Sequence, residues 1–134
     1  MVKLYQNFDI KKDDKGSIIL IGNFDGVHLG HQKLFKQAQF YKKKYNLKIG
    51  VVNFNPMPIM FFNQSLKNFR LSSISQKINL LNNQSVDFII TKKFDKTFSK
   101  TKSINFIKNI LSNKLKARFI FVSSNFRFGN KREG

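Results

Sequence analysis

Four apolar runs, each followed by a more polar segment, recur along the chain. They are SIILIGNF (17–24), LKIGVVNFN (47–55), VDFIITKKF (86–94) and ARFIFVSSNF (117–126). All four are rich in β-branched and aromatic residues and lack strict alternation, which is typical of strands buried on both faces of a parallel sheet. We therefore expect strands near residues 17–22, 48–54, 86–91 and 117–123. A short additional strand near 2–6 is expected at an edge of the sheet.

Helical spacing of apolar residues predicts three helices between these strands, over 28–45, 72–83 and 101–115. The expected inward-facing residues are Leu29, Leu34, Phe35, Ala38 and Tyr41 in the first helix, Ile74, Ile78 and Leu81 in the second, and Ile104, Ile107, Ile110 and Leu111 in the third. Ser72 or Ser73 is expected to cap the second helix. Strands that alternate with helices predict one α/β domain over residues 1–134, with a mostly parallel sheet and flanking helices.

Composition agrees with a folded domain. The chain has 134 residues and is 41% hydrophobic, which is enough for one hydrophobic core. It has no cysteine, so a disulfide framework and a thiolate metal site are excluded. The N-terminal segment MVKLYQNFDIKKDDKG lacks the apolar core of a signal peptide, and no stretch reaches the roughly 20 apolar residues of a membrane span. These features predict a cytoplasmic protein.

The formal net charge is +18, from 25 Lys and Arg against 7 Asp and Glu. Such a balance is typical of nucleic-acid binding, because lysines neutralise backbone phosphates. The alternative is compositional drift, since Lys, Asn, Ile and Phe are all abundant and the lysines are spread along the chain. We favour drift, together with a modest need to attract anionic small molecules.

Both histidines lie in IGNFDGVHLGHQ (21–32), where the first predicted strand passes into the first predicted helix. Ligands of open parallel sheets bind beyond the carboxyl ends of the strands. Glycines there allow backbone amides to approach an anion, and the N-terminus of the next helix attracts negative charge. His28 and His31 can donate hydrogen bonds to phosphate oxygens. The segment therefore predicts a phosphate site; the alternative is that the pair caps the helix and packs the loop.

The longer segment IGNFDGVHLGHQKL resembles the signature of the bacterial bifunctional riboflavin kinase/FAD synthetase family, in its N-terminal FMN adenylyltransferase module. The similarity continues in register through NFNPMPIMFF, RLSSISQKINLL and the last two apolar runs with their loops, and so covers nearly the whole chain. The resemblance implies a Rossmann-like nucleotidyltransferase fold. It also implies transfer of AMP from ATP to FMN, which forms FAD and releases pyrophosphate.

The resemblance assigns roles to individual residues. His28 and His31 match the family's phosphate-binding pair and are the expected catalytic residues. The expected ATP-binding residues are Gly22, Asn23, Phe24, Asp25, Gly26, His28, Gly30 and His31. The expected flavin-binding residues are Pro56, Pro58, Phe62, Asn125 and Phe128, with core packing as the alternative for Phe62. Mg²⁺ is the expected cofactor, and Asp25 either helps to organise it or forms an Asx turn.

The sequence also departs from the family pattern. Ser123 stands where a glycine is usual, which is expected to crowd a backbone approach. The family's Ser/Thr-rich segment ending in Arg, its closing strand and helices, and its riboflavin kinase domain are not found in these 134 residues. The resemblance therefore implies a fold incomplete at the C-terminus, weak or undetectable FAD synthesis and no riboflavin kinase activity. An open sheet edge predicts self-association.

Two other interpretations stay open. The first is a nucleotide- or flavin-binding remnant without activity. The second is a basic nucleic-acid-binding protein, or a fragment of a class I aminoacyl-tRNA synthetase, whose HIGH signature is chemically akin to HLGH. The FDG before the histidines, and the NPMP and FRFG segments, favour the adenylyltransferase over the synthetase.

Overall fold

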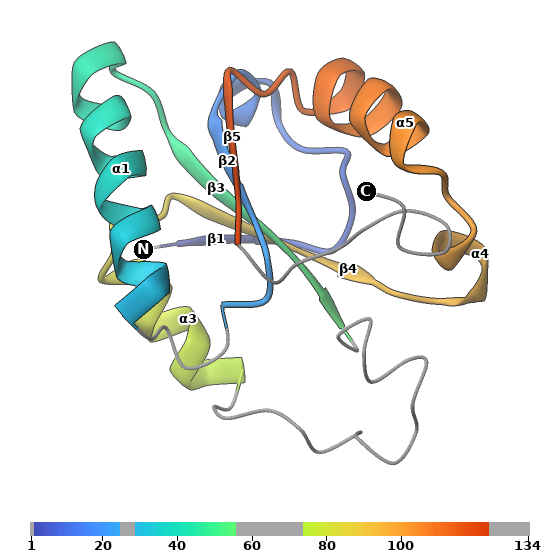
Figure 1. Ribbon diagram of the computed structural model, residues 1–134, viewed down its shortest axis with the longest axis horizontal. Coiled ribbons are helices and arrows are strands. Elements are labelled where there is room, and N and C mark those ends of the chain that lie inside the picture. Colours follow the sequence, from blue (N-terminus) through green and yellow to red (C-terminus); the bar gives the residue numbers. More distant parts are fainter. Residues whose placement is uncertain (1, 25–28, 56–73, 124–134) are drawn as a thin grey trace.

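The computed structural model describes residues 2–24, 29–55 and 74–123 of the chain. Its centre is a five-stranded sheet in the order β1-β4-β3-β2-β5, and every pair of neighbouring strands is parallel (Figure 1). The strands are β1 (Lys3–Tyr5), β2 (Ile18–Ile21), β3 (Ile49–Asn55), β4 (Phe88–Lys93) and β5 (Phe119–Val122). The predicted α/β class, the four main strands and the short edge strand are all confirmed.

Helices cover both faces of this sheet. The helical elements are α1 (Leu29–Tyr45), α3 (Ile74–Asn82), α4 (Lys96–Ser99), α5 (Ser103–Asn105), the π-helix η3 (Phe106–Lys114) and a 3-10 turn η1 (Lys12–Asp14). The α1 and α3 helices pack on one face and η3 packs on the other (Figure 1). None of the helices in these described segments is long and apolar enough to cross a membrane.

The two core layers meet in β2. Ile18 and Leu20 belong to the layer under α1 and α3, whereas Ile19 and Ile21 belong to the layer under η3. All four side chains are fully buried. Fully burying one such side chain contributes roughly 1.5–3 kcal/mol, so β2 is a main source of the fold's stability.

In the first two helices, the predicted inward faces are confirmed wherever the side chains are described. In α1, Phe35 and Ala38 are fully buried, and Leu34 and Tyr41 pack against the same layer. Leu81 of α3 is fully buried, and Ile78 packs beside it. The side chains of Leu29 and Ile74 and the predicted capping residues Ser72 and Ser73 lie outside the described residues.

The inward face predicted for the third helix is wrong in its first turn. Ile104 and Ile107 are 62% and 45% exposed, whereas Phe106, Leu111 and Leu115 are buried. The difference arises because the helix is wider than an α-helix: the N–H of Leu115 donates to the carbonyl of Ile110, five residues back, at 2.9 Å. An α-helical period therefore assigned the wrong residues to the core at the start of this segment.

The expectation that β5 is buried on both faces is also wrong. Phe119 and Phe121 pack against Tyr41 of α1, with ring centroids 4.7 and 5.8 Å away. Ile120 and Val122, which point to the other face, are 43% and 38% exposed. The strand lies at the end of the sheet and has a neighbouring strand on one side only, so less of it is covered. Self-association through this edge stays a prediction.

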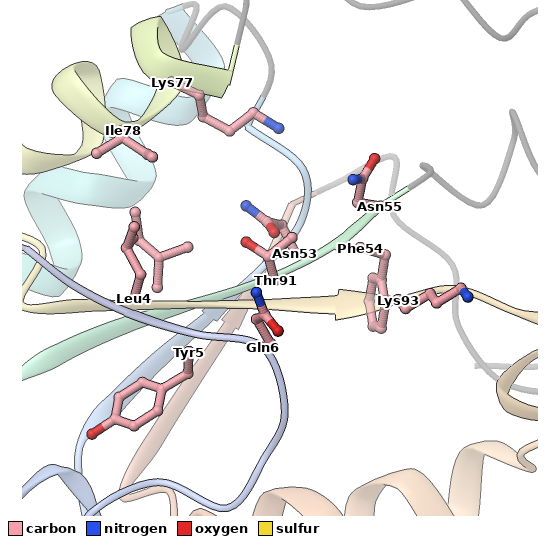
Figure 2. Close-up of a pocket in the computed structure, with 11 residues that line it drawn as sticks. Leu4, Tyr5, Gln6, Asn53, Phe54, Asn55, Lys77, Ile78, Thr91 and Lys93 are labelled. Carbon is pink, nitrogen blue, oxygen red and sulfur yellow. The ribbon is translucent and has the colours of Figure 1, made fainter.

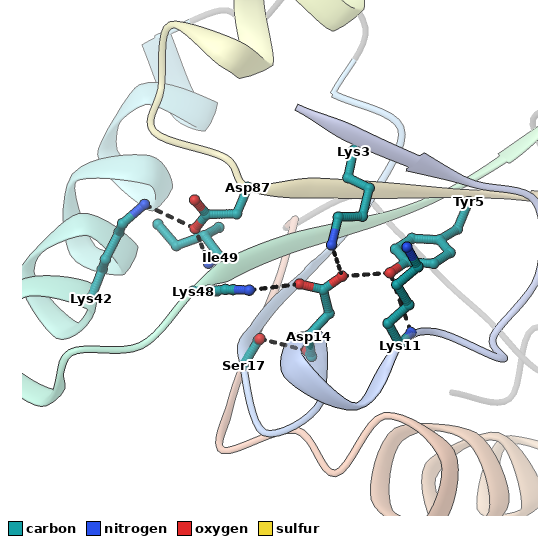
Figure 3. A network of polar contacts seen from close by, with 9 residues as sticks. All are labelled: Lys3, Tyr5, Lys11, Asp14, Ser17, Lys42, Lys48, Ile49 and Asp87. Carbon is teal, nitrogen blue, oxygen red and sulfur yellow. Dashed lines mark hydrogen bonds and ion pairs between the residues drawn. The ribbon is translucent and has the colours of Figure 1, made fainter. Parts of the chain in front are cut away.

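One buried carboxylate joins the amino ends of the strands. Asp14 is 2% exposed and accepts hydrogen bonds from Lys3 Nζ at 2.9 Å, from Lys48 Nζ at 3.0 Å and from the Tyr5 hydroxyl (Figure 3). Burial opposes ionisation of Asp14, but these three donors outweigh it and lower its pKa from 3.8 to about 2. Asp14 thus connects η1 to β1 and to the start of β3.

We expect Asp14→Asn to lower the free energy of unfolding at pH 7 by about 2 kcal/mol, the amount that corresponds to its lowered pKa. Because the folded-state pKa is depressed, the carboxylate stabilises the fold above pH 4 and this contribution is lost as pH falls toward 2. Urea unfolding of the wild type and the variant between pH 2 and pH 7 measures both effects.

Asp9→Asn is the matched control for this experiment. Asp9 forms an ion pair with Lys114 at 3.3 Å, but its side chain is 74% exposed. We expect a change below about 0.5 kcal/mol, because solvent screens exposed pairs. Equal effects of the Asp9 and Asp14 substitutions would contradict the assigned role of Asp14.

Candidate functional site

The order of the strands creates a switch point beside β2. Its carboxyl end lies between those of β3 and β5, and the chain crosses from β2 to β3 on one side while β5 lies on the other (Figure 1). Connections that diverge from neighbouring strands leave a crevice beyond their carboxyl ends, where open α/β sheets bind ligands. The glycine- and histidine-containing segment begins at this point, as the sequence predicted.

Gly22 joins the end of β2 to its neighbour β3 at the switch point. Its N–H donates to the carbonyl of Val52 in β3 at 3.1 Å, and the N–H of Ser123 donates to the carbonyl of Ile21 at 3.1 Å. A Cβ on Gly22 would lie 2.7 Å from Ser123 Oγ and 3.2 Å from Ser123 Cβ. A side chain at position 22 would force Ser123 to shift and would adopt a φ of +157°, so glycine is strongly favoured here. Ser123 thus lies beside Gly22, and its expected effect on a backbone approach stays a prediction.

Asn23 fixes the loop to the neighbouring strand. Its Oδ1 accepts a hydrogen bond from the N–H of Phe54, near the end of β3, at 3.2 Å. This oxygen has a structural partner, so a contact with ATP phosphates would involve other atoms of Asn23. The loop after β2 and the end of β3 are held together by this bond and by the bond from Gly22.

Phe24 and His31 lie against each other at the start of α1. Phe24 has a φ of +51° and is 1% exposed. Its ring contacts the ring of Phe35 at 5.3 Å and the imidazole of His31 at 5.0 Å, edge to face. The side chain of Phe24 therefore belongs to the core, and only its backbone is placed to meet a ligand. His31 is half-buried in the first turn of a 17-residue helix, where the helix dipole favours an anion.

The other predicted site residues stay predictions. Gly30 lies in the first turn of α1. The residues outside the described segments are Asp25, Gly26, His28, Pro56, Pro58, Phe62, Asn125 and Phe128. Pro56 directly follows the last residue of β3, and Asn125 follows β5 by three residues. The predicted ATP and flavin segments thus begin at the carboxyl ends of three adjacent strands, β3, β2 and β5.

The residues described here do not include a metal site. No group of three His, Cys, Asp or Glu side chains within 2–24, 29–55 and 74–123 could hold an ion. The Mg²⁺ prediction rests on Asp25, which lies outside these segments.

A cavity that no sequence pattern predicted is lined in part by the end of β3. It has a volume of about 620 Å³ and lies between α3 and the carboxyl-terminal parts of β1, β4 and β3 (Figure 2). Asn53 of β3 and Lys77 of α3 line it, although they are only 4% and 5% exposed. The signal in the sequence was the pair of asparagines in VVNFNP, where polar residues interrupt a buried apolar run.

Comparison with known proteins places the chain in a class. Residues 10–134 match the model of the FAD synthetase family, and the chain belongs to this family. The segment HLGH therefore does not mark a fragment of an aminoacyl-tRNA synthetase.

Its relatives are longer proteins. The chain is 42% identical over 126 residues to a bifunctional riboflavin kinase/FMN adenylyltransferase of Buchnera aphidicola from Schizaphis graminum, covering 94% of the chain and 40% of that protein. It is 37% identical over 120 residues to the Escherichia coli K12 protein of the same description, covering 90% and 38%. An FAD synthetase of Listeria monocytogenes is 30% identical over 123 residues, covering 91% and 49%. The chain thus spans less than half the length of these relatives.

A solved structure supports the fold alone. A protein of Streptococcus pneumoniae, described as a macrolide-efflux protein, superposes with a TM-score of 0.84 at 23% identity, covering 98% of this chain and 44% of the other. The described strands and helices therefore form a known arrangement.

We expect Gly22→Ala to destabilise the protein by roughly 2 kcal/mol or more, because Gly22 has a φ of +157° and a Cβ there meets Ser123. The double substitution Gly22→Ala/Ser123→Gly should recover part of this loss, since it removes the steric contact but leaves the backbone strain. Thermal and urea unfolding of the four proteins of this cycle measures the coupling. Simple additivity of the two substitutions would show that the contact with Ser123 does not limit residue 22.

Proposed function

We propose that this chain catalyses the adenylyl-transfer step of FAD synthesis, with ATP and FMN as substrates. The observation that carries the proposal is the match to the FAD synthetase family over residues 10–134, which contains the whole glycine and histidine segment. The relatives with this segment are described as FMN adenylyltransferases or FAD synthetases. The position of the segment, at the switch point of a parallel sheet, supports a nucleotide site.

The reaction is a displacement at phosphorus. An oxygen of the FMN phosphate attacks the α-phosphorus of ATP, the bond from that phosphorus to the bridging oxygen breaks, and pyrophosphate leaves. No covalent bond to the protein is needed, so the chain has to align the two substrates and stabilise the charge on the leaving group.

The residues at the switch point suit these two tasks. Gly22 allows the backbone to approach the phosphates closely, and the N-terminus of α1 favours their negative charge. In the proposal, His28 and His31 donate hydrogen bonds to the ATP phosphates and to the leaving pyrophosphate. Pro56, Pro58, Phe62, Asn125 and Phe128 surround the flavin. Mg²⁺ is proposed to arrive with ATP, bound mainly by the nucleotide's own phosphates.

The test is to incubate the purified chain with FMN, ATP and Mg²⁺, and to follow FAD and pyrophosphate by chromatography and a coupled assay. We expect FAD and pyrophosphate in equal amounts, at the low rate that the missing Arg-bearing segment implies, and no product when riboflavin replaces FMN, because riboflavin lacks the attacking phosphate. His28→Ala and His31→Ala should each lower the rate by roughly 10²-fold or more, as removal of a donor to developing charge does.

Gln37→Ala, on the exposed side of α1, is the control and should leave the rate unchanged. Titration with ATP and with FMN is done in parallel. If both ligands bind and no FAD forms, the chain is a binding protein without activity and the catalytic proposal is wrong. Histidine variants with wild-type rates would contradict the roles given to His28 and His31.

A further inference from the structure

Ser123 places a hydroxyl group at the switch point. It directly follows β5, as Gly22 directly follows β2, and the last residues of these two parallel strands, Val122 and Ile21, are paired (Figure 1). The N–H of Ser123 donates to the carbonyl of Ile21 at 3.1 Å, which fixes its backbone beside β2. Ser123 and Gly22 therefore lie next to each other, where open α/β sheets bind ligands.

The hydroxyl oxygen is the part of Ser123 that faces Gly22. A Cβ on Gly22 would lie 2.7 Å from Ser123 Oγ but 3.2 Å from Ser123 Cβ. Because Gly22 has no side chain, the space beside this hydroxyl stays open at the end of β2. A ligand oxygen that approaches the backbone of Gly22 thus comes within reach of Ser123 Oγ as well.

This hydroxyl still has hydrogen bonds to give. Ser123 is half-buried, and in the described part of the chain it is held through its backbone N–H, with no partner for its Oγ. A serine hydroxyl can donate one hydrogen bond and accept two. The family that the sequence resembles has glycine at this position, so the hydroxyl is a feature of this chain that the family pattern does not supply.

The surroundings of Ser123 favour a negatively charged acceptor. The contact between the rings of Phe24 and His31, with centroids 5.0 Å apart, brings the first turn of α1 to the loop that begins at Gly22. The helix dipole and the free N–H groups of such a first turn attract anions. The 17 residues of α1 include no acid. A hydroxyl that donates to an ionised oxygen forms one of the stronger hydrogen bonds in proteins.

We propose that Ser123 Oγ donates a hydrogen bond to a phosphate oxygen of ATP at the switch point, and so contributes to nucleotide affinity. This proposal rests on the proposed function, which supplies ATP as the ligand. It assigns to Ser123 a role opposite to crowding: the hydroxyl takes up some of the space beside Gly22 but replaces it with a donor.

The test is equilibrium binding of ATP, adenosine and FMN to the wild-type chain, Ser123→Ala and Ser123→Gly, with adenosine measured by competition against ATP. Ser112→Ala, on the exposed side of η3, is the matched control. We expect Ser123→Ala to weaken ATP binding roughly tenfold, as loss of a hydrogen bond to a charged group does. Adenosine and FMN should change less than twofold, and Ser112→Ala should resemble the wild type.

Ser123→Gly separates donation from crowding, because it removes both the hydroxyl and the contact with Gly22. If the hydroxyl donates to ATP, this variant should bind ATP more weakly than the wild type, as Ser123→Ala does. If the serine mainly crowds the backbone, Ser123→Gly should bind ATP more tightly, and that result would overturn the proposal.

A thermal melt of Ser123→Ala without ligand distinguishes binding from folding. Its melting temperature should equal that of the wild type, since the hydroxyl has no partner in the described part of the fold. A lower melting temperature would show that the hydroxyl stabilises the fold, and would overturn its role as a donor to the ligand.

The outcomes also separate this role of Ser123 from the proposed function. If the wild type and Ser123→Ala bind ATP equally, the role of Ser123 is wrong while the proposed function stands. Equal losses of ATP and adenosine would place the contact on the nucleoside, and a loss of FMN alone would place it on the other substrate; either result overturns the proposal. If the wild type does not bind ATP, the proposed function itself is wrong, and the role of Ser123 falls with it.

Discussion

Burial of β2 on all sides is the constraint on which the rest of the structure depends. Its four residues are fully buried, with alternate side chains in the two core layers and a parallel neighbour along each edge. Parallel pairing on both edges requires crossovers, and burial of both faces requires helices above and below. The order of the strands then leaves the carboxyl end of β2 at the switch point. The site is therefore a consequence of how the core is built.

The connection between the core and the candidate site is made by backbone hydrogen bonds and by one side chain, that of Asn23. Gly22 and Asn23 hold the loop after β2 to Val52 and Phe54 of β3, and Ser123 completes the contact from β5. The direction in which the chain leaves β2 is therefore fixed by hydrogen bonds that depend on glycine at position 22 and on the side chain of Asn23. The contact between the rings of Phe24 and His31 also holds this loop against the first turn of α1.

Local patterns predicted the strands and two helices because burial in this fold follows the sequence closely. The largely β-branched run from Ile18 to Ile21 is typical of a strand buried on both faces, and Phe35 and Ala38 have the spacing of an inward helix face. The third helix failed because an α-helical period was assumed, and hydrogen bonds to the fifth preceding residue move Phe106 inward in place of Ile107.

The candidate site was only partly accessible to the same reasoning. The glycine and histidine segment is continuous in sequence, so its spacing could be read directly. The cavity is not, since it depends on Asn53, Lys77 and Leu4, which come from three separate elements. The spacing of apolar residues within one segment does not show that the end of a strand and a distant helix enclose a cavity. The buried asparagine was the single local sign, and its meaning depends on what lies opposite it in the fold.

The distribution of acidic residues explains how the excess of lysines can serve both stability and binding. Asp14 and Asp87 lie just before strands, at the amino-terminal edge of the sheet. Asp14 accepts from Lys3 and Lys48, and Asp87 accepts from Lys42. Asp87 also accepts from the N–H of Ile49 at 2.8 Å, which aligns the starts of β3 and β4 (Figure 3). At this edge the charges are therefore compensated.

The carboxyl edge is different. Lys77 and Lys93 line the cavity there, and none of the described lining residues is acidic. The net charge of +18 favours the approach of anionic molecules to the protein as a whole. Asp95, just beyond the end of β4, accepts a hydrogen bond from the N–H of Phe98 at 2.8 Å and caps α4, so its carboxylate serves the fold at this edge as Asp14 and Asp87 do at the other.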